Sequence, residues 1–218
     1  TDIGVRTEGL RAEGYGQVPR WEHMGVSRAR ALSALTVAII IGIPLGLLMG
    51  LSEGLSAVLN PFVQFLRPLP KIALIPLAVV WLGIGEASKF FLIFIATFLS
   101  VVVGASAAVE RIGRSRIRVA QTLGASRRQI FMRVVLPDAL PDLFTTVRLS
   151  IGIGWTSLIA AEMVAASSGL GWMVINASSY LRTDIVMLGI LLLGGIGYLL
   201  DLLLLGLQRL TVPWAGKE

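Results

Sequence analysis

The residues of this chain that could do chemistry are few, and the two most unusual are acids within apolar sequence. Glu162 and Asp201 lie deep in two separate apolar runs, with neither a histidine nor a second acid nearby. General acid–base catalysis needs paired groups within reach of each other, so we expect no catalytic residue. A lone carboxylate in an apolar medium is costly unless it meets a partner, water or a cavity. Glu162 is therefore interpreted either as a protonated or paired structural group, or as part of a substrate or gating region.

Composition indicates an integral membrane protein. Hydrophobic residues make up 55% of the 218 residues and charged residues 15%, and the mean hydropathy is +0.81, outside the range of soluble domains. The chain has no cysteine and one histidine, His23, which excludes thiolate and multi-histidine metal sites. No nucleic-acid partner is expected, because the basic residues are not interleaved with aromatic ones.

Most of the positive charge gathers in one loop, residues 110–137, between two apolar runs. The loop carries seven arginines and one acid, Glu110, so its balance of +6 equals the net charge of the protein. Its arginines are Arg111, Arg114, Arg116, Arg118, Arg127, Arg128 and Arg133. By the positive-inside rule, a short cationic loop between spans is cytoplasmic and fixes the orientation of every other span. On charge alone, the loop needs no further function.

Five apolar stretches are long enough to cross a hydrocarbon core of about 30 Å as helices. They are residues 31–51, 61–83, 90–109, 138–166 and 185–207, within a transmembrane domain of residues 31–210. In the fourth, Pro141, Asp142 and Arg148 are typical of a membrane interface, and the apolar section itself begins near Leu149. We expect residues 1–30 to form a polar external arm and residues 211–218 a cytoplasmic tail. Residues 52–60 then form an internal polar turn, and the neutral residues 167–184 an external loop. Because an external polar arm is hard to export, a sixth span is expected before Thr1.

The second stretch cannot form one straight helix. Pro61, Pro68, Pro70 and Pro76 interrupt it, and each proline removes a hydrogen-bond donor and clashes with the preceding turn. One interpretation is a kinked structural helix with a cationic end. The other is a helix whose unwound backbone near Pro68 and Pro70 lines a translocation path.

Small residues in the spans predict close helix packing. Gly42, Gly46 and Gly50 recur in the first span, and Gly152 and Gly154 lie in the fourth. Glycines let two helix backbones approach closely, so we expect both helices to pack against protein rather than lipid.

Within the basic loop, the sequence predicts two short helices joined by a tight turn. Residues 115–123 suit a helix, and Gly124 permits the turned backbone that ends it. Ser126 can cap a second helix, with Gln129 three residues later as its capping-box partner. Such a pair of helices forms a rigid knob that another protein can grip.

This loop resembles the EAA signature of binding-protein-dependent ABC transporter permeases, which reads EAA, three residues, G, nine residues, I, one residue, L-P. The residues that follow the pattern are Ala120, Gly124, Val134, Leu136 and Pro137. Arg118 and Val119 stand where the signature has Glu and Ala. The blocks RPLPKIALIPLAVVWLGIGEASK and GWTSLIAAEMVAASSGLGWMV are similar to permeases that import taurine, aliphatic sulfonates, nitrate or bicarbonate. The runs RVAQTLGAS and TVPWAGKE look closest to the taurine type.

The resemblance implies an all-α fold: a polytopic transmembrane helical bundle like type I ABC importer permeases, in the bacterial inner membrane. It implies a homodimer of permease subunits, two cytoplasmic ABC ATPases and a periplasmic substrate-binding protein. The partner ATPases would bind ATP and Mg²⁺, because this chain has no GxxxxGK[ST] loop and is expected to hold no cofactor.

The resemblance also implies roles for single residues. Those expected at the ATPase contact are Arg118, Ala120, Leu123, Gly124, Ala125, Arg127, Arg128, Leu136 and Pro137. Those expected along the substrate pathway are Pro68, Pro70, Trp155, Thr156, Ser157 and Glu162. The arginines could instead anchor the loop to lipid, and Trp155 could be interfacial packing. The alternative class is an ion-coupled secondary transporter, in which Glu162 and the broken span would carry the coupling.

Overall fold

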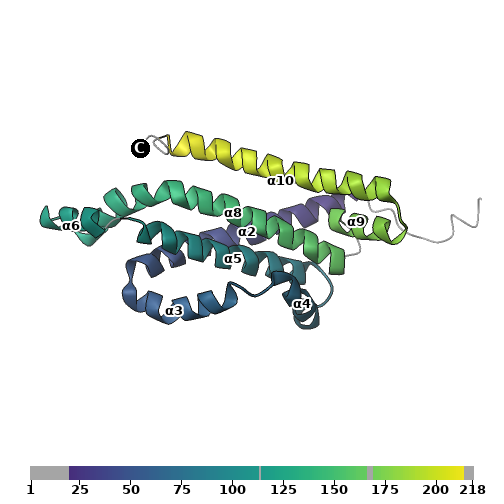
Figure 1. Cartoon of the computed structure of the whole chain (residues 1–218), viewed down its shortest axis with the longest axis horizontal. Coiled ribbons are helices and arrows are strands. Elements are labelled where there is room, and N and C mark those ends of the chain that lie inside the picture. The colour runs from purple at the N-terminus through teal and green to yellow at the C-terminus, as the bar shows by residue number, and fades with distance from the viewer. Residues whose placement is uncertain (1–19, 113, 166–168, 214–218) are drawn as a thin grey trace, which may run out of the picture.

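In the computed structural model, long helices run side by side and short helices lie at the two ends of the bundle (Figure 1). The structure describes residues 20–112, 114–165 and 169–213, and every regular element in these ranges is helical. The elements are α2 (Arg20–Leu51), α3 (Glu53–Leu66), the 3-10 turn η1 (Lys71–Ala73), α4 (Leu74–Leu82), α5 (Glu86–Glu110), α6 (Arg114–Thr122), α7 (Arg127–Ile130), the π-helical η2 (Phe131–Val135), α8 (Leu136–Ala165), α9 (Leu170–Ser179) and α10 (Thr183–Thr211).

Helix lengths and composition support the five predicted membrane crossings. Four spans are long and apolar enough by themselves: Leu32–Leu51, Glu86–Glu110, Arg127–Val164 and Thr183–Thr211. The pair Glu53–Leu66 and Lys71–Leu82 makes a fifth crossing when the two are taken together, and it is bent by 80°. The break in the second span, predicted from its prolines, is confirmed.

The first two long helices pack through glycines. Gly42, Gly46 and Gly50 follow each other at four-residue spacing on α2 and face α5. A Cβ added at Gly46 would lie 2.6 Å from the backbone oxygen of Val102, closer than real side chains approach. The prediction that this span packs against protein is therefore confirmed.

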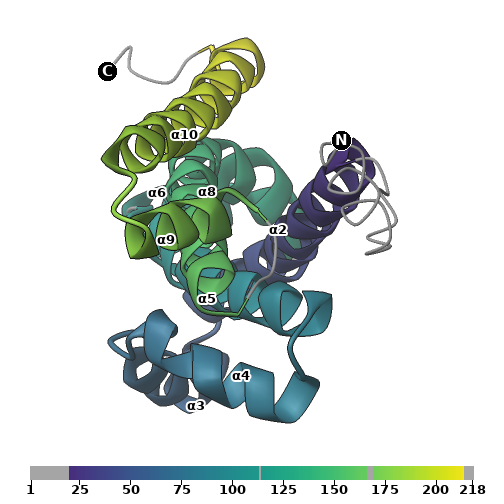
Figure 2. The same ribbon diagram turned by 90° about the vertical axis from the view of Figure 1, so that its right-hand side faces the viewer.

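Helix α8 packs on α5 through a second set of close contacts. Gly104 of α5 faces Thr146 of α8, and Gly154 of α8 faces Thr97 of α5. A Cβ added at Gly152 would meet nothing within 4 Å, so the tight packing predicted for both glycines of this span holds only for Gly154. Helix α10 lies beyond α8, on the side away from α5 (Figure 2).

Two segments predicted to be non-helical contain helices. Residues 53–60 are helical rather than a polar turn, and Ser52 caps α3 by accepting a hydrogen bond from the Leu55 amide at 3.4 Å. Residues 167–184, predicted as a loop, contain α9. The fourth span is helical over its predicted residues up to Ala165, since α8 begins at Leu136 and continues α7 and η2.

The expected arm and tail are described only in part. Residues 20–30 of the arm continue α2 as helix, and residues 1–19 lie outside the described residues. In the tail, residues 214–218 also lie outside them.

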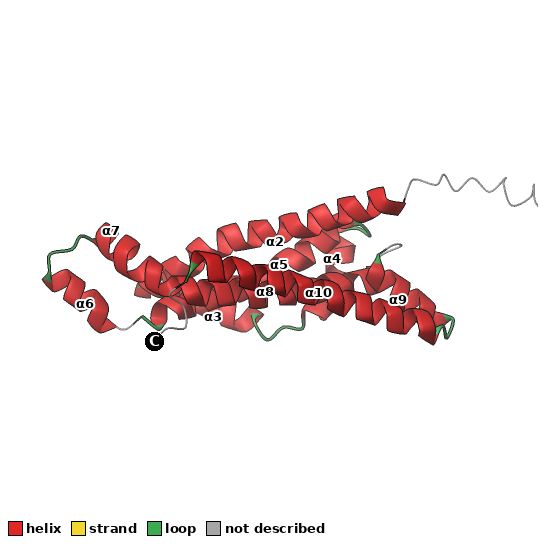
Figure 3. Cartoon of the chain, turned by 90° about the horizontal axis from the view of Figure 1, so that it is seen from above, coloured by secondary structure: helices red, strands yellow, loops and turns green. Residues whose placement is uncertain are grey.

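The helices alternate between two ends of the bundle. Helices α6 and α7 lie at one end, called the loop end below, together with the start of α3 and the last turns of α10 (Figures 1 and 3). Helices α4 and α9 lie at the opposite end. This alternation agrees with the predicted order of crossings and brings the loop and the end of α10 to the same side.

Candidate functional site

The basic loop folds into an elbow, residues 114–130, made of α6, a turn and α7, which projects at the loop end (Figure 3). Gly124 in the turn has φ +77°, a left-handed conformation that favours glycine. Its amide donates to the Gln121 carbonyl at 3.0 Å, and the Ala125 amide donates to the Ala120 carbonyl at 3.1 Å. These two bonds form a Schellman motif, so the helix stop predicted at Gly124 is confirmed.

Helix α7 begins with the predicted capping box. The Gln129 amide donates to Ser126 Oγ at 3.3 Å, and the Ser126 amide donates to Gln129 Oε1 at 2.8 Å. The box satisfies two backbone donors at the start of the helix, which fixes the direction in which the chain leaves the turn.

The L-P pair of the signature lies within a continuous span. The Leu136 amide donates to the Phe131 carbonyl five residues earlier, which marks the π-helical register of η2. Pro137 follows in the first turn of α8 and has no amide hydrogen to donate. A local π turn just before a proline is a common way to keep a helix continuous around a missing donor, and such turns are frequent at functional sites.

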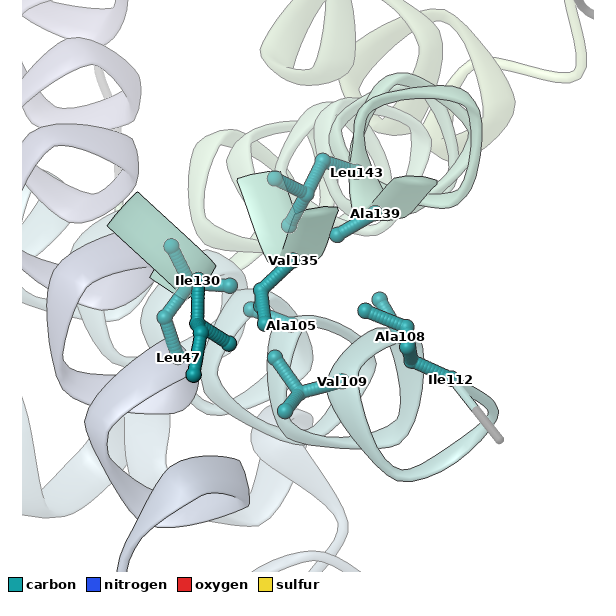
Figure 4. Packing of buried hydrophobic residues seen from close by; sticks show 9 residues of the cluster. All are labelled: Leu47, Ala105, Ala108, Val109, Ile112, Ile130, Val135, Ala139 and Leu143. Atoms are coloured by element: carbon teal, nitrogen blue, oxygen red, sulfur yellow. The ribbon is translucent and has the colours of Figure 1, made fainter. Parts of the chain in front are cut away.

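The two sides of the elbow differ in their contacts. Ala120, Ala125 and Leu136 pack against a buried apolar cluster that joins α2, α5 and the α7 to α8 segment (Figure 4). The cluster consists of Leu47, Ala105, Ala108, Val109, Ile112, Ile130, Val135, Ala139 and Leu143. Leu123, at the tip, is 81% exposed. The small residues therefore seat the elbow on the bundle, and the tip points away from it.

The arginines around the elbow fall into two groups. Arg116 of α6 donates to both carboxylate oxygens of Asp138 at 2.8 and 2.6 Å, and Arg111 donates to Asp142 at 3.3 Å. Both acids lie in the first two turns of α8, so these pairs tie the loop to that helix. A second group is exposed and pairs with no acid within the described part of the chain: Arg118, Arg127 and Arg128.

The predicted pathway residues lie in separate places. Trp155 lines a cavity of about 440 Å³ between α8 and α10, and its indole nitrogen donates to the Leu193 carbonyl at 3.3 Å. The Thr156 hydroxyl is on the exposed side of α8 and donates to the Gly152 carbonyl at 2.8 Å. Ser157 is half-buried and its hydroxyl bonds its own helix in the same way.

Pro68 and Pro70 lie far from this cavity in the fold. Both are exposed at the bend between α3 and η1, with Arg67 on one side and Lys71 on the other. Figure 2 shows α3 and α4 on one side of α5 and α10 on the other. The structure does not bring these prolines together with Trp155 within one chain.

Glu162 is buried at the opposite end of the bundle, where it caps α9. Its Oε2 accepts a hydrogen bond from the Gly171 amide at 2.9 Å. A Cβ added at Gly169 would lie 2.6 Å from the Glu162 carboxyl carbon, so only glycine leaves room for the carboxylate. Lys89, buried and bonded to Glu86 at 2.9 Å, is an electrostatic neighbour. This geometry favours the paired structural interpretation of Glu162.

Sequence reasoning missed one further pair, Arg148 with Asp201. Arg148 Nε donates to Asp201 Oδ1 at 2.9 Å and Nη2 donates to Oδ2 at 2.7 Å, across α8 and α10. From the sequence, Arg148 is expected at the membrane interface and Asp201 as a lone acid within its span. Their opposite charges within two apolar runs were the available signal, but no spacing rule links residues on distant helices.

A larger cavity, about 620 Å³, lies at the loop end between α2, α3 and α5. Two acids, Glu53 and Glu110, line it together with polar residues of α3. Its charges have the same sign as an anionic solute, so this cavity does not suit one.

Comparison with known families decides the class of this protein. Residues 42–217 match the family described as binding-protein-dependent transport system inner membrane component. The chain belongs to this family. The taurine transport system permease protein TauC of Escherichia coli (strain K12) is 44% identical over 205 residues, which cover 94% of this chain and 74% of that protein. The putative aliphatic sulfonates transport permease protein SsuC of the same organism is 37% identical over 194 residues, covering 89% and 74%.

The permease also shares the fold of a solved importer. A chain in an inward-facing structure of the MetNI methionine ABC transporter aligns with TM-score 0.73 and 21% identity, over 87% of this chain and 93% of that one. The predicted all-α fold, the ABC permease family and the multi-pass inner-membrane location are thus confirmed.

Proposed function

We propose that this permease imports a small organosulfonate, with taurine favoured, and that a separate ATPase drives it. The observation that carries the proposal is the 44% identity to a taurine permease over nearly the whole chain. Nitrate and bicarbonate are weaker candidates, because the two relatives described above are named for taurine and aliphatic sulfonates.

The elbow is the proposed contact with the ATPase. Leu123 is an exposed apolar side chain at its tip, and a Cβ added at the neighbouring Gly124 would meet nothing within 4 Å. The exposed cations of the elbow give the same surface a positive charge, which suits a groove with acidic residues. Ala120 and Ala125 of the elbow pack on the buried cluster at the start of α8. A displacement of the tip by the ATPase would therefore be transmitted to the membrane spans.

The proposed assembly contains two copies of this permease, two cytoplasmic ATPases and a periplasmic binding protein. ATP and Mg²⁺ would bind to the ATPases, since the chain contains no phosphate-binding glycine loop. The permease then couples ATP hydrolysis to transport without catalysing a reaction itself.

The test is uptake by reconstituted vesicles that contain the permease, its ATPase and its binding protein. We expect taurine and alkanesulfonates to accumulate only with ATP, and nitrate to accumulate poorly. Gly124→Trp should abolish uptake while membrane insertion is retained, because it adds bulk at the tip and a side chain at positive φ. Gly54→Trp is the matched control, since Gly54 lies in α3 with open space around it. Uptake without ATP, driven by an ion gradient, would support a secondary transporter instead.

A further inference from the structure

The cavity between α8 and α10 contains opposite charges inside two membrane spans. Its volume is about 440 Å³, enough for a small organic ion. Its polar, aromatic and glycine lining residues are Thr145, Arg148, Gly152, Trp155, Gly197 and Asp201, and apolar side chains complete the wall: Leu149, Ile151, Leu200 and Leu204. Figure 1 shows α10 lying along α8 over most of its length, so the cavity is within the spans rather than at a loop.

Arg148 is held in place but keeps donors available. Arg148 donates to Asp201 through two of its N–H groups, on Nε and Nη2. Its Nη1 lies 3.5 Å from Gln208 Oε1, at the distance limit of a hydrogen bond. A guanidinium has five N–H donors, so unused ones remain to meet an anion. The side chains are 24% and 45% exposed, so the pair borders the cavity and is not sealed away.

Holding α10 against α8 does not require an ion pair. An ion pair removed from water is often no more stabilising than apolar residues of similar volume, and α10 already contacts α8 through Trp155 and Gly197. Charged residues within spans instead tend to mark the path of an ion or substrate.

The exposed face of α8 next to the cavity supports a polar path. Thr145, Gly152 and Thr156 are exposed on it, with Leu149 among them. A helix face that met only lipid would carry large apolar side chains throughout, whereas small and hydroxyl residues suit a face lined by water or protein.

We propose that Arg148 is an anion-binding residue for the sulfonate group during translocation, and that Asp201 is the positioning residue that holds its guanidinium in the cavity. This rests on the function proposed above, because the sulfonate is the assumed cargo. A planar guanidinium matches the oxygens of a sulfonate as it matches those of a carboxylate or phosphate. Asp201 also neutralises Arg148 while the cavity is empty, which lowers the cost of keeping a cation in the span.

Single and double variants separate an anion site from a structural pair. Arg148→Gln should lower ATP-driven taurine and ethanesulfonate uptake about tenfold or more, as expected for loss of one charge-assisted contact. Asp201→Asn should instead tighten ethanesulfonate binding, because Arg148 loses its competing anion. Arg209→Gln is the matched control: it removes an exposed α10 cation in the last turn of the helix.

Binding is read from the purified complex with its ATPase, as the shift in unfolding temperature that ethanesulfonate produces. We expect this shift in the wild type and in Arg209→Gln, a larger shift in Asp201→Asn, and none in Arg148→Gln. An equal shift in Arg148→Gln would overturn the proposal. So would equal loss of uptake in both single variants with recovery in the double variant, since that pattern indicates a pair that only fastens α10.

The proposed import of sulfonates can be tested separately from the proposed anion site. If wild-type vesicles take up no sulfonate with ATP, the assignment of cargo is wrong, while the temperature shift still tests the anion site.

Discussion

Asp138 at the loop end and Glu162 at the opposite end are held in opposite ways. At the loop end, Arg116 and Asp138 form an exposed pair, and the nearby elbow is fixed by backbone motifs. At the opposite end, Glu162 is buried and is held by the backbone amide of Gly171. The loop end carries its ion pair at the surface, and the opposite end encloses Glu162 in a packed joint between α8 and α9.

This contrast predicts a different free-energy cost for structural changes at the two ends. Exposed ion pairs contribute little stability because water screens them, so loss of the Arg116 and Asp138 pair costs little free energy of unfolding. A buried carboxylate that loses its hydrogen-bond donor leaves an unpaired charge in an apolar site. Any rearrangement that separates Glu162 from α9 should therefore cost more free energy. We therefore expect variants at the opposite end to affect folding and variants at the loop end to affect coupling.

The largest effect is expected from a side chain at Gly171. A Cβ there would lie 2.7 Å from the Ile159 carbonyl oxygen and 2.9 Å from Glu162 Cβ, so Gly171→Val must move backbone. We expect a loss of about 3 kcal/mol of unfolding free energy, or no folded protein. The measurement is thermal unfolding of the detergent-solubilised permease, with yield as a second readout.

Gly152→Val is the control for that experiment, because a Cβ at Gly152 meets nothing within 4 Å. Similar losses at the two glycines would show that Gly171 is not specially confined, and the contrast between the ends would lose its structural basis.

A smaller effect is expected at Glu162. Glu162→Ala leaves the Gly171 amide without its acceptor and should cost about 2 kcal/mol of unfolding free energy. Glu162→Gln keeps an oxygen that can accept the same hydrogen bond and should cost clearly less. The comparison is made by thermal unfolding of both variants under one condition.

If the glutamine variant is as unstable as the alanine variant, the negative charge itself is required. Lys89 would then be the partner that matters, and the capping interpretation of Glu162 would be wrong.

The parts of this molecule that depend on neighbouring residues in sequence were predictable. Gly124 and the Ser126 and Gln129 pair follow local rules of backbone conformation and capping, and the structure agrees with them. The glycine spacing on α2 and the prolines of the second span are also local signals.

Contacts between distant residues were not predictable from one sequence. The Arg148 and Asp201 pair and the bond from Gly171 to Glu162 depend on which helix faces are brought together. The first half of α3 is predicted wrongly for another reason. Its polar residues Glu53, Ser56 and Asn60 recur on one face of an amphipathic helix, and the same polar residues are also typical of a turn.

The smallest change in stability is expected from Asp138→Asn, which weakens the pair between α6 and α8. Because the Arg116 and Asp138 side chains are 57% and 32% exposed, the loss should stay below about 1 kcal/mol. Uptake should nevertheless fall more than stability does, because the elbow would tilt on α8 when the ATPase pulls on it and less of its motion would reach the spans.

The ratio of ATP hydrolysed to taurine accumulated measures this loss of coupling. Asp184→Asn removes a comparable exposed pair with Arg182 at the opposite end and should leave that ratio unchanged. A rise in the ratio in both variants, or in neither, would mean that the loop end has no special part in coupling.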